Sequence, residues 1–319
     1  MTEASKPLDL VCSDFSAALA LLRELGMRLD LIYPADDPHS AMLTHNGLTV
    51  RLTSRPDAPP LSANTGAFRP EFLITHRETA AAEGRAAMLY RDLIPGRLGG
   101  RYIASHIQIE ESGPVADWVH YHRIAFQLIC VRRGWVRVVY EDQGAPFVMS
   151  AGDMVLQPPG IRHRVLESGD GLEVVEITCP ALHETFADHD MALPNGTPDS
   201  GRTYGGQHFL HHRSAEMPWR PWHGAEAQET GVGGATGGLA EARLLRPGAE
   251  TLIAVPPHDG ELVFGFVLEG SARLERDGDA WPLGPADAFV IPPGISWRLA
   301  EASGDFRMLH VTTARIAEM

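Results

Sequence analysis

The chain has 319 residues, of which 44% are hydrophobic, and it carries a net charge of −14. This length fits two or three globular domains, and the negative charge argues against nucleic acid or an anionic membrane surface as a partner. The three cysteines are scattered without paired or metal-site spacing, which indicates a reducing compartment and no disulfide framework. The sequence shows no apolar signal segment and no apolar run of membrane-spanning length, so we expect a cytoplasmic protein without a membrane partner.

The first predicted unit, residues 1–60, contains a strand, a helix and three further strands. Asp14 has the side chain of a helix N-cap, apolar residues follow it at helical spacing, and Gly26 is a natural helix end. The later strands are predicted over residues 29–33, 41–44 and 48–52, with a hairpin turn at Asn46-Gly47. This order resembles one module of the glyoxalase (vicinal oxygen chelate) fold. The His and Glu that supply a metal site in that family are missing here, so we interpret the module as structural, a lid or a dimer contact.

Residues 61–95 are predicted to be a linker, because Pro, Ala, Ser and Asn are frequent in and just before its first part. Two strands, over residues 89–93 and 102–109, lead into the next unit. In the second of them His106 shares one face with Ala104 and Gln108, and one face of this strand is expected to look into a barrel. His106 is therefore a candidate catalytic or substrate-contacting residue, and a core or surface histidine is the alternative.

The strongest pattern in the chain begins with two histidines. His120 and His122 are two residues apart, so on a strand both side chains point to the same face. Gln127 has the opposite parity, so a turn or bulge must lie before it if it is to join that face. Gly134 is predicted to end this unit, and a further strand follows over residues 135–140.

A second pattern lies about twenty residues further on. An apolar strand after Gly152 enters the turn Pro158-Pro159-Gly160, and His163 lies just past that turn. Imidazole is the commonest side-chain metal ligand at neutral pH. Three imidazoles and one amide carbonyl converging inside a small barrel suit a divalent first-row metal ion.

These two patterns resemble the two motifs of the cupin superfamily. The family pattern is Gly, His-x-His, Glu and Gly, followed by Gly and Pro-x-Gly-x-x-His, and this sequence departs from it only at Gln127. The resemblance implies a jelly-roll barrel over residues 96–185. It also implies one divalent metal ion bound by His120, His122, Gln127 and His163, with Fe, Mn, Ni, Zn and Co all open.

Residues 186–240 are predicted to be a polar connecting segment, and the stretch 183–189 to be solvated. Residues 241–319 then repeat the strand order of the first barrel, including a Pro-Pro-Gly turn. The positions that correspond to the four ligands carry Pro256, His258, Val263 and Trp297. This repeat is similar to the bicupin arrangement with a metal-free second barrel. We therefore expect a mainly β protein, with two jelly-roll barrels preceded by a small α+β module.

The ligand set suggests the chemistry. Three neutral imidazoles and a neutral amide leave the full charge of the ion at the site, which favours chelation of an anionic oxygenated substrate. Cupins use such sites for oxygen-dependent C–C cleavage and for non-redox isomerisation, cyclisation or lyase reactions. The resemblance thus favours a dioxygenase acting on a small organic substrate. The alternatives are a zinc-type isomerase, cyclase or lyase, and a small-molecule-binding cupin without catalysis.

Two further expectations follow from the same residues. The amide of Gln127 cannot act as a base, so the base is expected to be His106, Tyr121 or a hydroxide on the ion. Cupins commonly pair their barrels, and the sheet edges of this chain must be covered, so a homodimer is expected.

Overall fold

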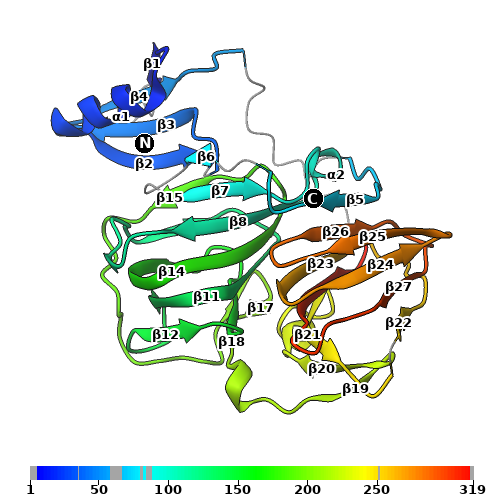
Figure 1. The fold of residues 1–319 in the computed structure, drawn as a ribbon. Helices are drawn as coiled ribbons and strands as arrows, with labels where there is room; N and C mark the ends of the chain where they lie inside the picture. The colour runs from blue at the N-terminus through cyan, green and yellow to red at the C-terminus, as the bar shows by residue number, and fades with distance from the viewer. Residues whose placement is uncertain are drawn as a thin grey trace.

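The computed structural model describes residues 6–34, 36–57, 67–79, 82–83, 88–250 and 252–316. These residues are mainly β structure and form a small N-terminal α+β module and two β-barrels that lie side by side (Figure 1). This arrangement confirms the predicted fold class. No helix within these ranges is long and apolar enough to cross a membrane.

The N-terminal module has the predicted order of strand, helix and three strands. Its elements are β1 (Leu8–Val11), α1 (Phe15–Glu24), β2 (Arg28–Tyr33), β3 (Ser40–His45) and β4 (Leu48–Thr53). The sheet order is β1-β4-β3-β2, with β1 parallel to β4. Asp14 caps α1 by accepting a hydrogen bond from the backbone N–H of Ala17 at 2.9 Å. Asn46 and Gly47 both have positive φ, as the tight turn between β3 and β4 requires.

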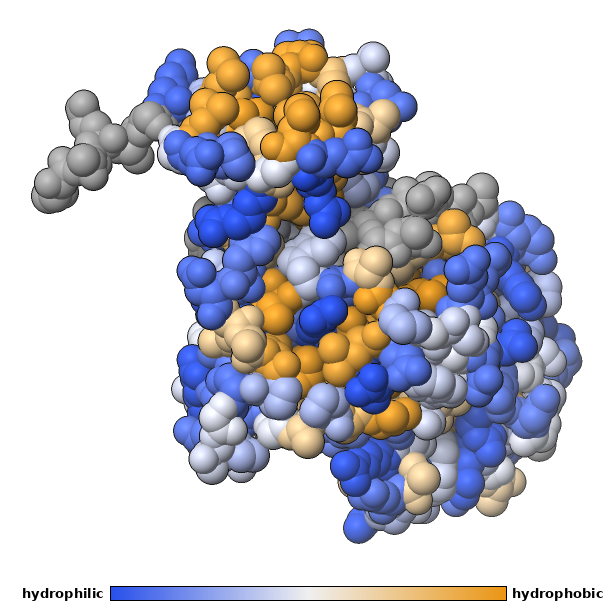
Figure 2. Space-filling model, turned by 90° about the vertical axis from the view of Figure 1, so that its left-hand side faces the viewer, coloured by the Kyte–Doolittle hydropathy of each residue, from blue (hydrophilic) through white to orange (hydrophobic). Residues whose placement is uncertain are grey.

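This module exposes an apolar surface, which Figure 2 shows at the top of the molecule. β1 is the edge strand of its sheet, and all four of its residues are exposed. The exposed large apolar side chains of the module are Leu8, Leu10, Val11, Leu21, Leu25 and Leu48. An apolar surface beside an open strand edge favours association with another chain.

The first barrel is built around two long antiparallel strands, β11 (Phe126–Tyr140) and β14 (His163–Cys179). The other elements are β7 (Leu89–Asp92), α2 (Arg97–Gly100), β8 (Ile103–Ile109), β9 (Gly113–Pro114), β10 (His120–His122), β12 (Phe147–Ser150) and β13 (Met154–Leu156). β14 pairs with β8 along one part of its length and with β10 at His163. The chain leaves strand conformation between β10 and β11, as the parity of Gln127 predicted.

Gly134 was predicted to end a strand, but β11 runs through it. The register of β11 against β14 shifts on both sides of Arg133, which marks a β-bulge. Gly134 has a φ of +71°, and a Cβ added there would overlap the carbonyl oxygen of Gly169. Glycine is therefore needed for the bulge rather than for a chain break.

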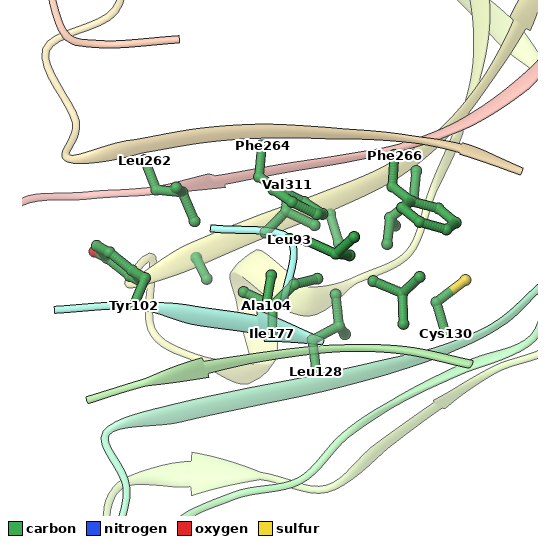
Figure 3. Close-up of a cluster of buried hydrophobic side chains, with 14 of the residues drawn as sticks. Leu93, Tyr102, Ala104, Leu128, Cys130, Ile177, Leu262, Phe264, Phe266 and Val311 are labelled. Atoms are coloured by element: carbon green, nitrogen blue, oxygen red, sulfur yellow. The ribbon is translucent and has the colours of Figure 1, made fainter. Parts of the chain in front are cut away.

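Both faces of the β11–β14 sheet are buried. Val174 and Glu176 line the interior of the first barrel, whereas Val175 and Ile177, which alternate with them, pack toward the second barrel. Figure 3 shows this contact between barrels, with Leu128, Cys130 and Ile177 on one side and Leu262, Phe264 and Phe266 on the other. This contact places the outer face of the first sheet in an apolar environment.

The second barrel contains two sheets, of orders β19-β20-β21-β28-β23-β26-β5 and β22-β27-β24-β25. Their bounds are β5 (Leu73–Thr75), β19 (Arg220–Trp222), β20 (Ala225–Glu229), β21 (Ala240–Pro247), β22 (Leu252–Val255), β23 (Leu262–Glu269), β24 (Ala272–Arg276), β25 (Asp279–Leu283), β26 (Ala288–Ile291), β27 (Trp297–Ala300) and β28 (Arg307–Thr313). The repeated strand order is present in this barrel, and β26 precedes the predicted Pro-Pro-Gly turn, which is Pro292-Pro293-Gly294. Phe289 and Trp297 fill the interior of this barrel.

The two segments expected to be linkers contribute strands to the barrels. Within residues 61–95, β5 pairs with β26 and β7 pairs with β8, while residues 58–66 lie outside the described ranges. Within residues 186–240, β18 pairs with β13 and β20 pairs with β21. The short elements of these segments are β6 (Ala82–Glu83), β16 (Thr203–Tyr204), β17 (Gln207–His208), β18 (Leu210–His212), η2 (Ser214–Glu216) and α3 (Val232–Ala235). The predicted division of the chain into units stays a proposal. In that proposal the second barrel now also includes β5, β19 and β20, which pair within its sheet.

The stretch 183–189 was predicted to be solvated, and this is wrong for its first half. β15 (Thr185–Ala187) pairs with β10 on one side and with β2 on the other. It therefore joins the sheet of the N-terminal module to the first barrel. His183 and Thr185 are buried, and their polar atoms find hydrogen-bond partners inside the protein, which the polar composition alone does not reveal.

Candidate metal centre

Three histidines converge inside the first barrel. The potential ligand atoms of His120, His122 and His163 all lie within 4.8 Å of one another, and all three side chains are buried. His120 and His122 share one face of β10 because they are two residues apart. His163 begins β14, directly across from His120 in the antiparallel pairing. Strand pairing thus joins two motifs that are about forty residues apart in the sequence.

Hydrogen bonds orient each imidazole ring. Nδ1 of His120 lies 2.8 Å from the carbonyl oxygen of Trp118, and Nδ1 of His163 lies 3.1 Å from that of Ile161. A carbonyl oxygen only accepts, so in both rings Nδ1 carries the proton and Nε2 presents its lone pair. Nδ1 of His122 lies 3.0 Å from the hydroxyl oxygen of Thr185. Metal-bound histidines characteristically have such a partner on the second ring nitrogen.

Two glutamine side chains lie beside this cluster. Gln127 is fully buried, its Oε1 accepts a hydrogen bond from Nε2 of Gln157 at 3.1 Å, and its own Nε2 has no partner. Nε2 of Gln157 also lies 3.0 Å from Nε2 of His163, and the Tyr140 hydroxyl donates to Oε1 of Gln157 at 2.8 Å. Gln157 was not among the residues predicted from the sequence. It stands two residues after the inward-facing Val155, so strand alternation predicts the same face.

The histidines form part of the wall of a cavity of about 70 Å³. Most of its lining is apolar, and Figure 2 shows an apolar area with hydrophilic residues in its middle below the N-terminal module. The apolar lining includes Ile107, Ile129, Val136, Val138, Leu172 and Val174. The other polar residues of the lining are Tyr90, Tyr140, Gln157, Arg164 and Glu176. Burial, followed by the charges of Glu176 and Asp117, raises the pKa of the Tyr140 hydroxyl far above its usual range.

His106 does not line this cavity. It lies on the opposite face of β8 from the cavity-lining Ile107, and its ring packs against Phe266 of the second barrel at 5.7 Å. Its Nε2 lies 2.8 Å from a carboxylate oxygen of Glu173, and its Nδ1 lies 3.2 Å from the Arg91 guanidinium. Burial lowers the pKa of His106 against the opposing effect of Glu173. This placement gives no support to the expected catalytic role, because His106 belongs to a buried polar network between the barrels.

Tyr121 also points away from the cavity. It lies between His120 and His122 on β10, so its side chain takes the opposite face. Its ring stacks on Phe186 at 5.1 Å, and the Arg162 guanidinium lies 4.2 Å from the ring centre. The position of Tyr121 therefore gives no support to its expected role as a base.

β15 and the segment just before it bring two further residues to the site, Thr185 and His183, which were not predicted from the sequence. Thr185 supplies the hydroxyl beside His122, and the His183 ring meets the His122 ring edge-on at 5.4 Å. Burial lowers the pKa of His183, so this ring is neutral near pH 7. No sequence signal connects β15 to β10, because their pairing depends on the tertiary fold.

The residues present fit a divalent transition metal ion. Three buried imidazoles, each with Nδ1 beside a hydrogen-bond partner, offer nitrogen ligands that suit several first-row metals and do not select one. Within the described ranges this is the one cluster of its kind. In the second barrel, Val263 and Trp297 belong to the apolar core, and Nε2 of His258 lies 3.2 Å from the carbonyl oxygen of Ile291.

Comparison with known proteins agrees with this architecture. The family described as "Cupin domain" matches residues 244–312, in the second barrel, and no curated protein matches the sequence. A variant of oxalate decarboxylase from Bacillus subtilis has a similar structure, with a TM-score of 0.56, 12% identity, and coverage of 80% of this chain and 81% of that chain. Salicylate 1,2-dioxygenase from Pseudaminobacter salicylatoxidans gives a TM-score of 0.57 at 17% identity over 80% and 87% of the two chains. At these identities the likeness is one of fold.

Proposed function

Because this chain is a two-barrel member of the cupin superfamily, we propose that its first barrel is the active site of a metal-dependent enzyme. The observation that carries the proposal is the convergence of His120, His122 and His163, with Nδ1 held by neighbours, at the wall of a mostly apolar cavity. In this proposal the second barrel is a scaffold, because Trp297 and Val263 occupy ligand positions with side chains that cannot bind a metal ion.

The cavity indicates the class of substrate. Its apolar walls exclude water and favour a small, largely apolar organic molecule, while the polar groups near the histidines favour oxygen atoms at one end of that molecule. When bound, a divalent ion supplies Lewis acidity and, if it is redox-active, electron transfer. The neutral imidazoles leave the charge of the ion for an anionic substrate oxygen. We therefore place an oxygenase acting on a small enolisable or hydroxy-aromatic compound first.

Glu176 is our candidate for the proton-accepting residue, in place of His106 and Tyr121. It lines the cavity from β14, opposite Ile129 of β11 in the strand pairing. A carboxylate in a mostly apolar cavity is a suitable general base for a substrate hydroxyl or an acidic C–H group. Tyr140 remains protonated because of its raised pKa, so it acts as a hydrogen-bond donor instead.

The same carboxylate favours a second candidate function. Proton transfer by Glu176 together with a Lewis-acidic ion is sufficient for isomerase or lyase chemistry without oxygen. The two functions differ in their need for dioxygen, so the reaction under air and under nitrogen separates them.

The experiment combines metal analysis with turnover. We expect about one metal ion per chain in the wild type, loss of most of it in His120→Ala, and retention in His258→Ala, the matched variant at a motif position of the second barrel. The loaded protein is then tested with diketones, catechols and hydroxy-aromatic acids, with oxygen uptake and product formation recorded. Equal turnover under nitrogen rejects the oxygenase and supports the second candidate. Full metal occupancy in His120→Ala contradicts the metal site itself.

We also propose that the chain is a homodimer whose contact includes the exposed apolar surface of the N-terminal module. β1 offers an open strand edge, and Leu10 of β1 and Leu25 at the end of α1 are among the exposed apolar side chains of the module. Light scattering is expected to give twice the chain mass of 34.7 kDa and a smaller mass for Leu10→Glu. A monomeric wild type at micromolar concentration contradicts this proposal.

A further inference from the structure

We infer that the amide oxygen ligand of the metal ion comes from Gln157, and that Gln127, at the cupin motif position, instead donates a hydrogen bond to it. This inference rests on the proposed metal site of the first barrel. It departs from the motif-based ligand set of three histidines and residue 127. It requires the Gln157 amide to turn when the ion binds.

The position of Gln157 is that of a ligand. The terminal amide atom nearest to the cluster lies 3.0 Å from Nε2 of His163, and the residue lines the cavity together with all three histidines. Two donor atoms at about 2.1 Å from one ion and at right angles to each other lie about 3.0 Å apart. The separation between Gln157 and His163 is therefore that of neighbouring ligands. Gln127 is equally buried but, unlike Gln157, does not line the cavity.

The present orientation of Gln157 is incompatible with a bound cation. Its Nε2 lies between two acceptors, Nε2 of His163 and Oε1 of Gln127. An ion takes the lone pair of His163, and the positive end of the Gln157 amide dipole then faces a positive charge. A half-turn of the planar amide exchanges its oxygen and nitrogen within nearly the same volume and reverses this dipole. The energetic conflict is thereby removed without displacement of the backbone.

Tyr140 permits this turn. Its hydroxyl lies 2.8 Å from Oε1 of Gln157 and donates to it in the present orientation. A hydroxyl group has one donor hydrogen and two acceptor lone pairs, so it accepts a hydrogen bond equally well from an amide N–H. Gln157 is only 1% exposed, which makes a partner at this end necessary in both orientations.

Gln127 completes the exchange. Its Nε2 is buried without a hydrogen-bond partner, and its Oε1 faces Gln157 at 3.1 Å. If Gln127 also turns, its Nε2 donates to the oxygen of Gln157 and the unpaired donor gains a partner. A buried unpaired N–H is costly, so this exchange favours the loaded arrangement.

Replacing each glutamine by glutamate distinguishes the metal ligand from the hydrogen-bond donor. Binding of Co²⁺, with no substrate present, is the property measured. Gln157→Glu places a carboxylate at the ligand position, so we expect tighter Co²⁺ binding than in the wild type. Gln127→Glu removes the donor and sets two oxygens against each other, so we expect Co²⁺ binding weaker by about tenfold or more. Gln143→Glu adds the same charge outside the cavity lining and controls for long-range attraction. Dissociation constants come from competition with a chelator, and the visible spectrum of Co²⁺ reports the ligand field.

The outcomes separate this inference from the proposed function. Gln157→Leu is expected to weaken Co²⁺ binding and alter the visible spectrum, with circular dichroism confirming that it folds. Tighter binding in Gln127→Glu together with unchanged binding in Gln157→Glu overturns the assignment to Gln157 and returns the ligand to the motif position. Wild-type affinity in His120→Ala, instead, overturns the metal site and with it the proposed function.

Discussion

Lowering the pH is expected to destabilise the second barrel through one buried histidine. His310 is 2% exposed, and neither of its ring nitrogens has a hydrogen-bond partner. Its ring packs between Trp222 at 5.2 Å and Trp297 at 5.7 Å. Burial, followed by the positive charges of Arg243 and neighbouring histidines, lowers its pKa from 6.5 to about 3.

The sign and size of the effect follow from this shift. The folded state holds His310 neutral, whereas the unfolded chain binds a proton below pH 6.5, so stability is complete above that pH and falls as the pH drops toward 3. Integration of the proton-binding difference from about pH 7 to about pH 5 gives a loss of about 2 kcal/mol. His310→Phe keeps a ring between the tryptophans and removes the titration. His310→Leu serves as a second variant if the larger ring does not fit.

The assay is urea unfolding at both pH values, followed by tryptophan fluorescence. Other groups titrate in the same range, so the quantity that matters is the difference between the wild type and the variant at each pH. We expect this difference to change by about 2 kcal/mol in favour of the variant at the lower pH. A difference that stays constant within about 0.5 kcal/mol refutes the reasoning, because His310 would then not be held neutral in the folded state.

Three other changes test the site and the second barrel. Thr185→Val keeps the shape of the side chain but removes the hydroxyl beside His122, and we expect metal affinity to fall about 10- to 100-fold in a chelator competition assay. Glu176→Gln is expected to lower kcat by about 100-fold or more while the metal content stays at the wild-type level; an unchanged rate argues against Glu176 as the base. Gly265→Ala adds a Cβ that overlaps the ring of Phe289, and we expect a loss of about 1–3 kcal/mol in thermal unfolding. Gly304→Ala, where nothing lies within 4 Å, is the control and should change stability far less.

Local sequence patterns determined the strand faces, the helix cap and the turns of this protein that were predicted correctly. His120 and His122 are two residues apart, so they lie on one face of their strand. The Pro-Pro-Gly turn places His163 at the start of the next strand. Short-range chemistry likewise determined the N-cap at Asp14 and the turn at Asn46-Gly47. These features depend on residues within a few positions of one another, so they can be predicted from the local sequence.

Strand alternation in the sequence also indicates the direction of two further side chains. The inward direction of His120 and His122 already implied that Tyr121 between them faces outward. In the same way, the alternation along β13 indicated that Gln157 shares the face of Val155. Strand parity was therefore sufficient to place Tyr121 on the face away from the cavity and Gln157 on the face toward it.

Only the tertiary structure decided which face of each strand meets the cavity. Parity shows which residues of β8 share a face, but both of its faces are buried, one in the first barrel and the other against the second. Hydrophobicity therefore gave no means of placing His106. The structure alone also brings Thr185 of β15 to His122 and Gln157 to Gln127, since these contacts join strands that are distant in sequence. Long-range pairing of this kind depends on the packing of the whole barrel, which no local pattern encodes.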